Sequence, residues 1–120
     1  RGATLVTLSG DLGAGKTAFV KAVAHVLGIE ETVTSPTFVL EKIYQLGSET
    51  PKFKRLIHID AYRLEAGSEL AQLGFDELMS DAGNLILLEW PGKVAEALPT
   101  PTARIFLAAL PDGSHTISYG

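Results

Sequence analysis

Eight residues near the start of the chain, Gly-Asp-Leu-Gly-Ala-Gly-Lys-Thr at 10–17, constrain its fold more than any other feature. They match the pattern G-x-x-x-x-G-K-T, follow an apolar run at 4–8 and precede a helical pattern at 18–27. Glycines let the backbone wrap closely around a phosphate chain, and the first turn of the helix that follows adds its own free N–H groups. A strand, a phosphate-binding loop and a helix in this order predict an α/β protein that binds a nucleoside triphosphate.

The motif gives each of its residues an expected role. Lys16 would reach the terminal phosphates, where it would also support catalysis, and the Thr17 hydroxyl would ligate Mg²⁺. Backbone N–H groups of the loop and of the first helical turn would surround the phosphates. The nucleotide-binding residues predicted in this segment are Gly10, Asp11, Leu12, Gly13, Ala14, Gly15, Lys16, Thr17 and Ala18.

Length and composition limit the classes of protein that the chain can represent. Its 120 residues predict one domain across 1–120, and no apolar run approaches the roughly 20 residues of a membrane span. The absence of cysteine excludes disulfides and thiolate metal sites and fits a reducing compartment, so we expect a cytoplasmic protein. A net charge of −4 argues against general electrostatic binding of nucleic acid. Because the chain opens at Arg1 without methionine, we expect a missing N-terminal segment.

The basic residues gather densely in one short stretch, Lys52, Lys54 and Arg55. Such a cluster is typical of the solvated edge of a strand, and it is also compatible with contact to a partner or to RNA.

Beyond the loop, hydrophobic patterning predicts a P-loop NTPase-like three-layer α/β fold with a mixed central sheet and antiparallel hairpins. A turn at 47–51 joins two strands as an antiparallel pair, and another at 111–113 closes a terminal hairpin. We expect Ser68 to cap a helix that Gly74 interrupts. The predicted strands are 4–8, 38–46, 53–60, 85–88, 104–110 and 115–119, and the predicted helices are 17–27, 68–80 and 94–98.

Two predicted strands end in a carboxylate. The strand Leu-Ile-His-Ile-Asp at 56–60 ends in Asp60, a pattern typical of a Mg²⁺-binding acid, although a turn cap is the simpler alternative. The apolar run at 85–88 is followed by Glu89, which could position or deprotonate an attacking water, act as a second metal ligand, or pair with Lys93. We therefore place Asp60 and Glu89 among the catalytic and metal-binding candidates without assigning the water to either.

Three further features carry weaker signals. Trp90 could stack on the nucleotide base or wall the pocket, and a core position is equally compatible. The segment Thr-Ser-Pro-Thr at 34–37 resembles a switch loop in which Ser35 and Thr37 would contact phosphate or Mg²⁺; a local turn is the alternative. His58 alternates with two isoleucines, which is compatible with lining the site but favours a structural histidine. The scattered histidines argue against a zinc site.

Four motifs together resemble the TsaE (YjeE) family of bacterial P-loop ATPases: residues 10–17, Thr-Ser-Pro-Thr-Phe at 34–38, His-Ile-Asp-Ala-Tyr-Arg-Leu at 58–64 and Leu-Glu-Trp-Pro at 88–91. The resemblance implies slow Mg²⁺-dependent ATP hydrolysis in threonylcarbamoyladenosine modification of tRNA, supporting turnover of a complex with TsaD and TsaB and touching tRNA only indirectly. By position, it implies that Lys16 binds phosphate, that Thr17 and Asp60 belong to the metal shell, that Glu89 and Trp90 lie at the nucleotide, and that Ser35 and Thr37 form a switch-like loop.

Two other functions remain open from the residues alone. One is a P-loop kinase of a small molecule, which normally needs an arginine-rich lid that this chain lacks the arginines to supply. The other is a nucleotide-dependent binding switch with negligible hydrolysis. The N-K-x-D guanine motif is absent, which weakly favours ATP over GTP.

Overall fold

The computed structural model describes residues 2–10, 15–29, 41–46 and 52–119. Within them, six strands form one sheet in the order β2-β3-β4-β1-β5-β6. Strands β1, β3, β4 and β5 run parallel, whereas β2 pairs antiparallel with β3 and β6 antiparallel with β5. The strands are β1 (Thr4–Ser9), β2 (Glu41–Gln45), β3 (Arg55–Asp60), β4 (Asn84–Glu89), β5 (Ala103–Ala109) and β6 (His115–Tyr119). The predicted mixed sheet and both antiparallel pairs are thereby confirmed.

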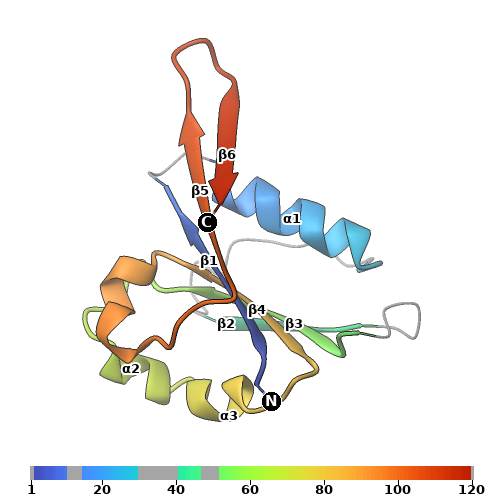
Figure 1. The fold of residues 1–120 in the computed structure, drawn as a ribbon, viewed down its shortest axis with the longest axis vertical. Helices are drawn as coiled ribbons and strands as arrows, with labels where there is room; N and C mark the ends of the chain where they lie inside the picture. Colours follow the sequence, from blue (N-terminus) through green and yellow to red (C-terminus); the bar gives the residue numbers. More distant parts are fainter. Residues whose placement is uncertain (1, 11–14, 30–40, 47–51, 120) are drawn as a thin grey trace.

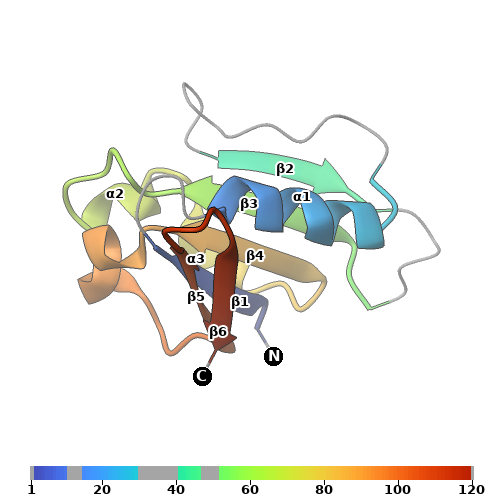
Figure 2. The same cartoon turned by 90° about the horizontal axis from the view of Figure 1, so that it is seen from above.

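Helices cover the two faces of the sheet unequally (Figures 1 and 2). The longest, α1 (Lys16–Val26), lies on one face. The other face carries α2 (Ser68–Ala71), α3 (Phe75–Met79) and the 3₁₀ helix η1 (Pro91–Ala97). The β5–β6 hairpin extends beyond this layered body. These three layers confirm the predicted architecture.

The strands divide their apolar side chains between two cores. On the α1 side, the buried cluster contains Leu8, Val20, Ala24, Tyr44, Leu56, Leu85 and Leu87. On the other side, the buried cluster contains Leu5, Ile57, Ile59, Ala61, Leu64, Leu70, Phe75, Ile86, Leu88 and Val94. Every residue of β4 is buried, as expected of a central parallel strand covered on both faces.

The predicted helix at 68–80 is two helices, separated by a turn in which Gly74 has φ +76°. Leu70 is buried in the core, and Leu73 and Leu78 pack against it. The predicted cap at Ser68 is wrong, because Gly67 occupies the cap position and no side chain caps the helix there. Backbone carbonyls of Ala66 and Gly67 accept the N–H groups of Glu69 and Leu70, and Glu69 Oε2 accepts the N–H groups of Glu65 at 2.6 Å and Ala66 at 3.0 Å in the turn that precedes the helix.

The helix expected at 94–98 begins earlier and is narrower: η1 starts at Pro91 and is a 3₁₀ helix. Proline suits the first helical position because its φ is already fixed and its missing N–H has no intrahelical partner there. Other boundaries shift by a few residues, and 38–40 of the strand expected at 38–46 lie outside the described residues. In the part of the chain that the structure describes, no helix is long and apolar enough to cross a membrane.

Candidate functional site

The candidate site lies at the carboxyl edge of the three central strands β1, β3 and β4. Parallel pairing places Asp60 of β3 opposite Glu89 of β4, and Glu89 opposite Leu8 of β1. Ligands of α/β proteins bind at this edge because loops and helix N-termini converge there. Alternation along the strands also puts Asp60 and Glu89 on the face that α1 covers, the face of Leu56 and Leu87.

Helix α1 begins where the phosphate-binding motif predicts. Gly15 is its N-cap residue with φ +99°, a left-handed conformation that glycine adopts without steric cost. Lys16 is the first helical residue and is only 6% exposed. Its ammonium donates a hydrogen bond to the Gly10 carbonyl, which spans the two ends of the motif. Thr17 follows in the first turn, half-buried, and Ala18 is exposed.

Trp90 forms a wall beside the lysine. The Lys16 Nζ atom lies 4.4 Å from the centroid of the Trp90 ring, within the range of a cation–π contact. Trp90 has φ +61° and ψ +55°, an uncommon backbone conformation for a bulky residue, and its ring lies 4.9 Å from that of Tyr62. This placement favours a position beside the terminal phosphates over stacking on the base, since Lys16 is the residue expected to meet those phosphates.

Asp60 is half-buried at the end of β3. Its Oδ1 accepts the Tyr62 N–H at 3.0 Å, so it does cap the turn that follows the strand. Burial raises the pKa of Asp60; the Tyr62 N–H lowers it, Glu89 raises it, and His58 and Lys16 lower it. Side chains of α1, β3 and β4, namely Lys16, His58 and Glu89, therefore act on Asp60 at this edge.

Glu89 is 3% exposed and contacts a histidine rather than the lysine considered above. Its Oε2 lies 2.5 Å from Nε2 of His58, which is fully buried. The predicted alternative of a pair with Lys93 is wrong, because the Lys93 ammonium lies over the Tyr62 ring, 5.6 Å from its centroid. The sequence pattern placed His58 opposite the isoleucines but did not single out its contact with Glu89, which depends on the register of β3 against β4.

The donor set fits Mg²⁺ bound together with phosphates. Among the residues that the structure describes, no group of three or more His, Asp or Glu side chains could hold a metal alone. Mg²⁺ usually takes one or two protein carboxylates, with phosphate and water oxygens completing its shell. A partly buried Asp60 whose pKa is raised by burial and by Glu89 is a carboxylate whose ionised form a cation would stabilise.

Some predicted site residues cannot be placed. Asp11, Leu12, Gly13, Ala14, Ser35 and Thr37 lie outside the described residues. Of the basic stretch at 52–55, Arg55 bonds to Asp81 and, at 2.8 Å, to Asn84, so part of it serves a local contact at the opposite edge of the sheet.

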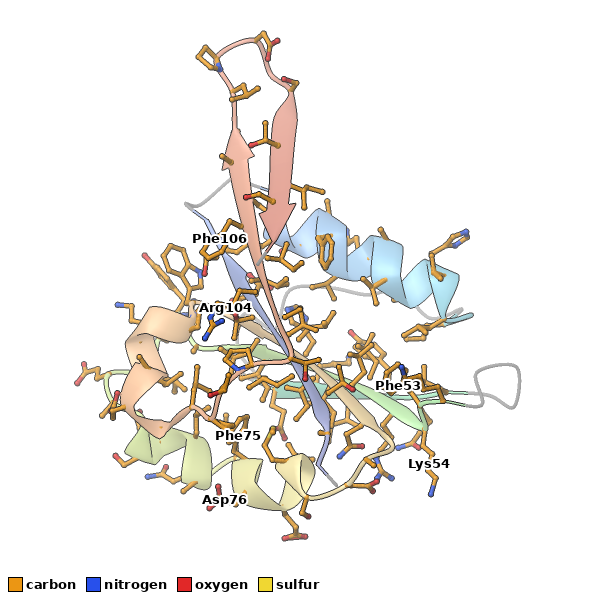
Figure 3. The ribbon with its side chains drawn as sticks, viewed as in Figure 1. Phe53, Lys54, Phe75, Asp76, Arg104 and Phe106 are labelled. Carbon is orange, nitrogen blue, oxygen red and sulfur yellow. The ribbon has the colours of Figure 1, made fainter. Side chains whose placement is uncertain are left out.

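A separate hollow lies away from α1. A cavity of about 330 Å³ is bounded by β1, β5, η1 and the segment that joins the last two. Arg104 and Phe106 of β5 line it, and Figure 3 labels both. Neither Lys16 nor the two carboxylates line this cavity.

The model of the family TsaE, described as threonylcarbamoyl adenosine biosynthesis protein TsaE, matches residues 1–116. Proteins named tRNA threonylcarbamoyladenosine biosynthesis protein TsaE match over 115 residues. That of Treponema pallidum is 41% identical, covering 96% of this chain and 80% of its own. That of Rickettsia prowazekii is 39% identical, covering 95% of this chain and 75% of its own. That of Bacillus subtilis is 40% identical, covering 96% of this chain and 68% of its own.

The fold has a match among solved structures as well. The crystal structure of Bacillus subtilis YdiB aligns with a TM-score of 0.76 and 34% identity, covering 98% of this chain and 68% of that one. The sheet order, the three layers and these matches agree with the P-loop NTPase-like fold and the family that the four motifs resemble. The chain belongs to the TsaE family of tRNA threonylcarbamoyladenosine biosynthesis proteins.

Proposed function

We propose that the chain binds ATP with Mg²⁺ at the carboxyl edge of β1, β3 and β4 and hydrolyses it slowly, in the service of threonylcarbamoyladenosine modification of tRNA. The observation that carries the proposal is the convergence of Lys16, Asp60 and Glu89 at one edge and on one face of the sheet. P-loop hydrolysis of a triphosphate uses a cation for the phosphates, an acidic ligand for the metal and a residue that orients the attacking water.

Lys16 is the phosphate-binding cation of this proposal. Its ammonium already bonds to a carbonyl oxygen, that of Gly10, and phosphate oxygens would compete for the same donor. Loss of solvent around this lysine, which is 6% exposed, strengthens its attraction for a developing negative charge. The Trp90 ring keeps water from one side of the ammonium.

The two carboxylates take different roles. Asp60, half-buried and turned toward Glu89, His58 and Lys16 by its place at the strand end, would hold Mg²⁺ together with the Thr17 hydroxyl. When bound, the metal neutralises charge on the β- and γ-phosphates. Glu89 would position the attacking water and accept its proton, because its carboxylate is deeply buried and one of its oxygens is already fixed.

A small-molecule kinase fits less well. Of the three arginines that the structure describes, Arg55 bonds to Asp81, Arg104 lines the separate cavity, and Arg63 alone follows a strand that ends at the site. A kinase lid normally brings several arginines over the phosphates.

We further propose that the chain acts with TsaD and TsaB and relates to tRNA only indirectly. We also propose that it acts in the cytoplasm, because a chain without cysteine forms no disulfides and needs no oxidising compartment.

Phosphate release from ATP and GTP, with Mg²⁺ or with EDTA and with or without TsaD–TsaB, tests the proposal. We expect slow, Mg²⁺-dependent release from ATP that needs no small-molecule acceptor and rises when the partners are added. Glu89→Gln should lower release about 100-fold or more, whereas the matched control Glu77→Gln, at an exposed position of α3, should not change it. ATP binding without release would favour the binding switch, and release that survives both Lys16→Ala and Glu89→Gln would contradict the proposed site.

A further inference from the structure

His58 and Glu89 form a buried contact between neighbouring strands. His58 pairs with Leu87 in the β3–β4 ladder and Glu89 pairs with Asp60, so His58 lies two positions before the strand end, beneath the carboxylates. Side chains diagonal to each other on one face of a sheet are within reach of a long or aromatic residue. The structure joins Nε2 of His58 to Oε2 of Glu89 at 2.5 Å.

We propose that His58 is a positioning residue that holds the Glu89 carboxylate in the orientation needed to place the attacking water. This inference rests on the proposed ATP hydrolysis. His58 itself touches neither nucleotide nor water in this account, and its effect on turnover passes entirely through Glu89.

Burial gives the first argument. His58 is 0% exposed and lies on the α1 face of the sheet, where its neighbours in the same strands are Leu56, Leu85 and Leu87. An apolar side chain would fill such a position without the cost of burying a polar ring. The imidazole instead supplies a hydrogen-bond partner to a carboxylate that is itself 3% exposed and has no other such partner among the described residues.

The second argument is which nitrogen of the His58 ring faces a partner. In the part of the chain that the structure describes, Nδ1 of His58 is buried and has no hydrogen-bond partner. A carboxylate oxygen can only accept a hydrogen bond, so the bond to Glu89 places a proton on Nε2 of His58, which donates it.

The third argument is what the bond leaves available on Glu89. Among the described residues, only Oε2 of the carboxylate is hydrogen-bonded, and Oε1 is not. Fixing one oxygen restricts rotation of the carboxyl group and leaves the other to accept from water. A general base must present an oxygen within hydrogen-bond distance of the water, so its orientation affects turnover more than nucleotide binding.

A double-mutant cycle on the full chain tests the proposal. His58→Met removes the donor at similar bulk, and His58→Gln keeps an N–H near the position of Nε2. We expect His58→Met to lower kcat for ATP hydrolysis about 10- to 100-fold, as removal of an orienting partner does elsewhere, with KM for ATP nearly unchanged. His58→Gln should restore most of the loss, and in a Glu89→Gln background His58→Met should lower kcat no further.

The matched control is His25→Met, which changes an exposed histidine of α1 and should leave kcat unaltered. Thermal unfolding of each variant separates misfolding from mispositioning. The proposal is overturned if His58→Met leaves kcat unchanged, or if it lowers kcat by the same factor with and without the Glu89 carboxylate. An inactive wild-type protein, even with TsaD–TsaB, would instead refute the proposed function and this inference with it.

A spectroscopic measurement examines the bond without relying on turnover. Imidazole ¹⁵N spectra of the wild-type protein should show His58 as the Nε2–H tautomer, with a slowly exchanging proton whose resonance shifts in Glu89→Gln. An Nδ1–H tautomer, or a resonance indifferent to Glu89→Gln, would contradict the bond on which the proposal depends.

Discussion

The two faces of the central sheet come from the same strands and both carry an apolar core, yet they differ at the carboxyl ends of β3 and β4. Facing α2, α3 and η1, β3 and β4 present Ile57, Ile59, Ile86 and Leu88, all buried in an apolar core. Facing α1, the same strands present leucines at first and then His58, Asp60 and Glu89. Because successive side chains of a strand point to opposite faces, a single register assigns stability to one face and chemistry to the carboxyl end of the other.

This difference shows that the fold holds its ionisable groups at the strand ends, where they have partners. A carboxylate or an imidazole would be unpaired in the apolar core. At the strand ends, Asp60 lies close to Lys16, and Glu89 contacts His58. Substitutions in the apolar core on the α2, α3 and η1 side should therefore change stability, and those of the ionisable residues at the carboxyl end of the α1 face should change binding and turnover. The four predictions below are ordered from the largest expected effect to the smallest.

Lys16→Ala should have the largest effect. Loss of a charge-assisted donor should weaken ATP binding about 10- to 100-fold and reduce phosphate release further. Isothermal titration with ATP and a phosphate-release assay measure the two quantities. Lys21→Ala, at an exposed position of the same helix, is the control and should leave both unchanged. Equal ATP affinity and equal phosphate release in the two variants would contradict a role of Lys16 in the site.

Ile86→Ala probes the apolar face. The side chain is 0% exposed in the core of β4, so its truncation should lower the free energy of unfolding by about 2–5 kcal/mol. The fraction that remains folded should keep the wild-type affinity for ATP. Ile117→Ala, at a residue 58% exposed on β6, should change stability far less. Denaturant unfolding compares the two, and a stable Ile86→Ala protein with impaired binding would break the division between the faces.

Gly74→Ala tests the break between α2 and α3. Nothing lies within 4 Å of an added Cβ, but φ is +76°, so the cost is conformational strain, about 1–2 kcal/mol, without a clash. Gly92→Ala meets equally open space without a positive φ and should be neutral or slightly stabilising. Thermal unfolding of both variants measures the difference, and equal melting temperatures would contradict it.

Asp60→Asn should have the smallest effect on stability, and the size of that effect depends on pH. Burial raises the pKa of Asp60, so the native state binds this proton more readily than the unfolded chain. The group's contribution to stability is therefore full below its unfolded pKa and is lost as pH rises through the raised native value. At neutral pH Asp60→Asn should raise the melting temperature, and the gain should vanish in acid.

Asp112→Asn is the control of opposite sign. Hydrogen bonds from Ser114 hold the pKa of Asp112 below its usual range, so its contribution is present above the unfolded pKa and is lost as pH falls through the native value. This substitution should lower the melting temperature at neutral pH. Parallel shifts of the two variants with pH would refute the assignment.

The sequence predicted those parts of the fold that depend on local pattern. The run at 85–88 predicted a strand, because a strand covered on both faces typically carries a short unbroken apolar run, and β4 is buried throughout. Gly74 indicated the break between α2 and α3, because few other residues accept its backbone conformation. The order of strand, loop and helix at 4–27 predicted the phosphate-binding edge and the position of Lys16.

Contacts between distant segments were beyond prediction from local pattern. Ser68 is a good capping residue, yet the helix begins one residue earlier, at a Gly67 cap whose N–H group donates to Glu96 of η1. The partner of Glu89 could not be chosen between neighbours in sequence, since His58 reaches it only through the pairing of β3 with β4. The proximity of Trp90 to Lys16 likewise depends on the left-handed backbone at Trp90, for which a tryptophan gives no local signal.

The most direct test of the central claim measures binding and turnover in the same sample of Glu89→Gln. Trp90 is the one tryptophan of the chain and lies beside Lys16, so its fluorescence should report nucleotide binding. We predict that ATP with Mg²⁺ changes the fluorescence of Glu89→Gln at the same ATP concentrations as in the wild-type protein, while phosphate release falls about 100-fold or more. Phosphate release at the wild-type rate, or loss of binding together with release, would contradict the claim that the α1 face of the β3–β4 edge is the hydrolytic site.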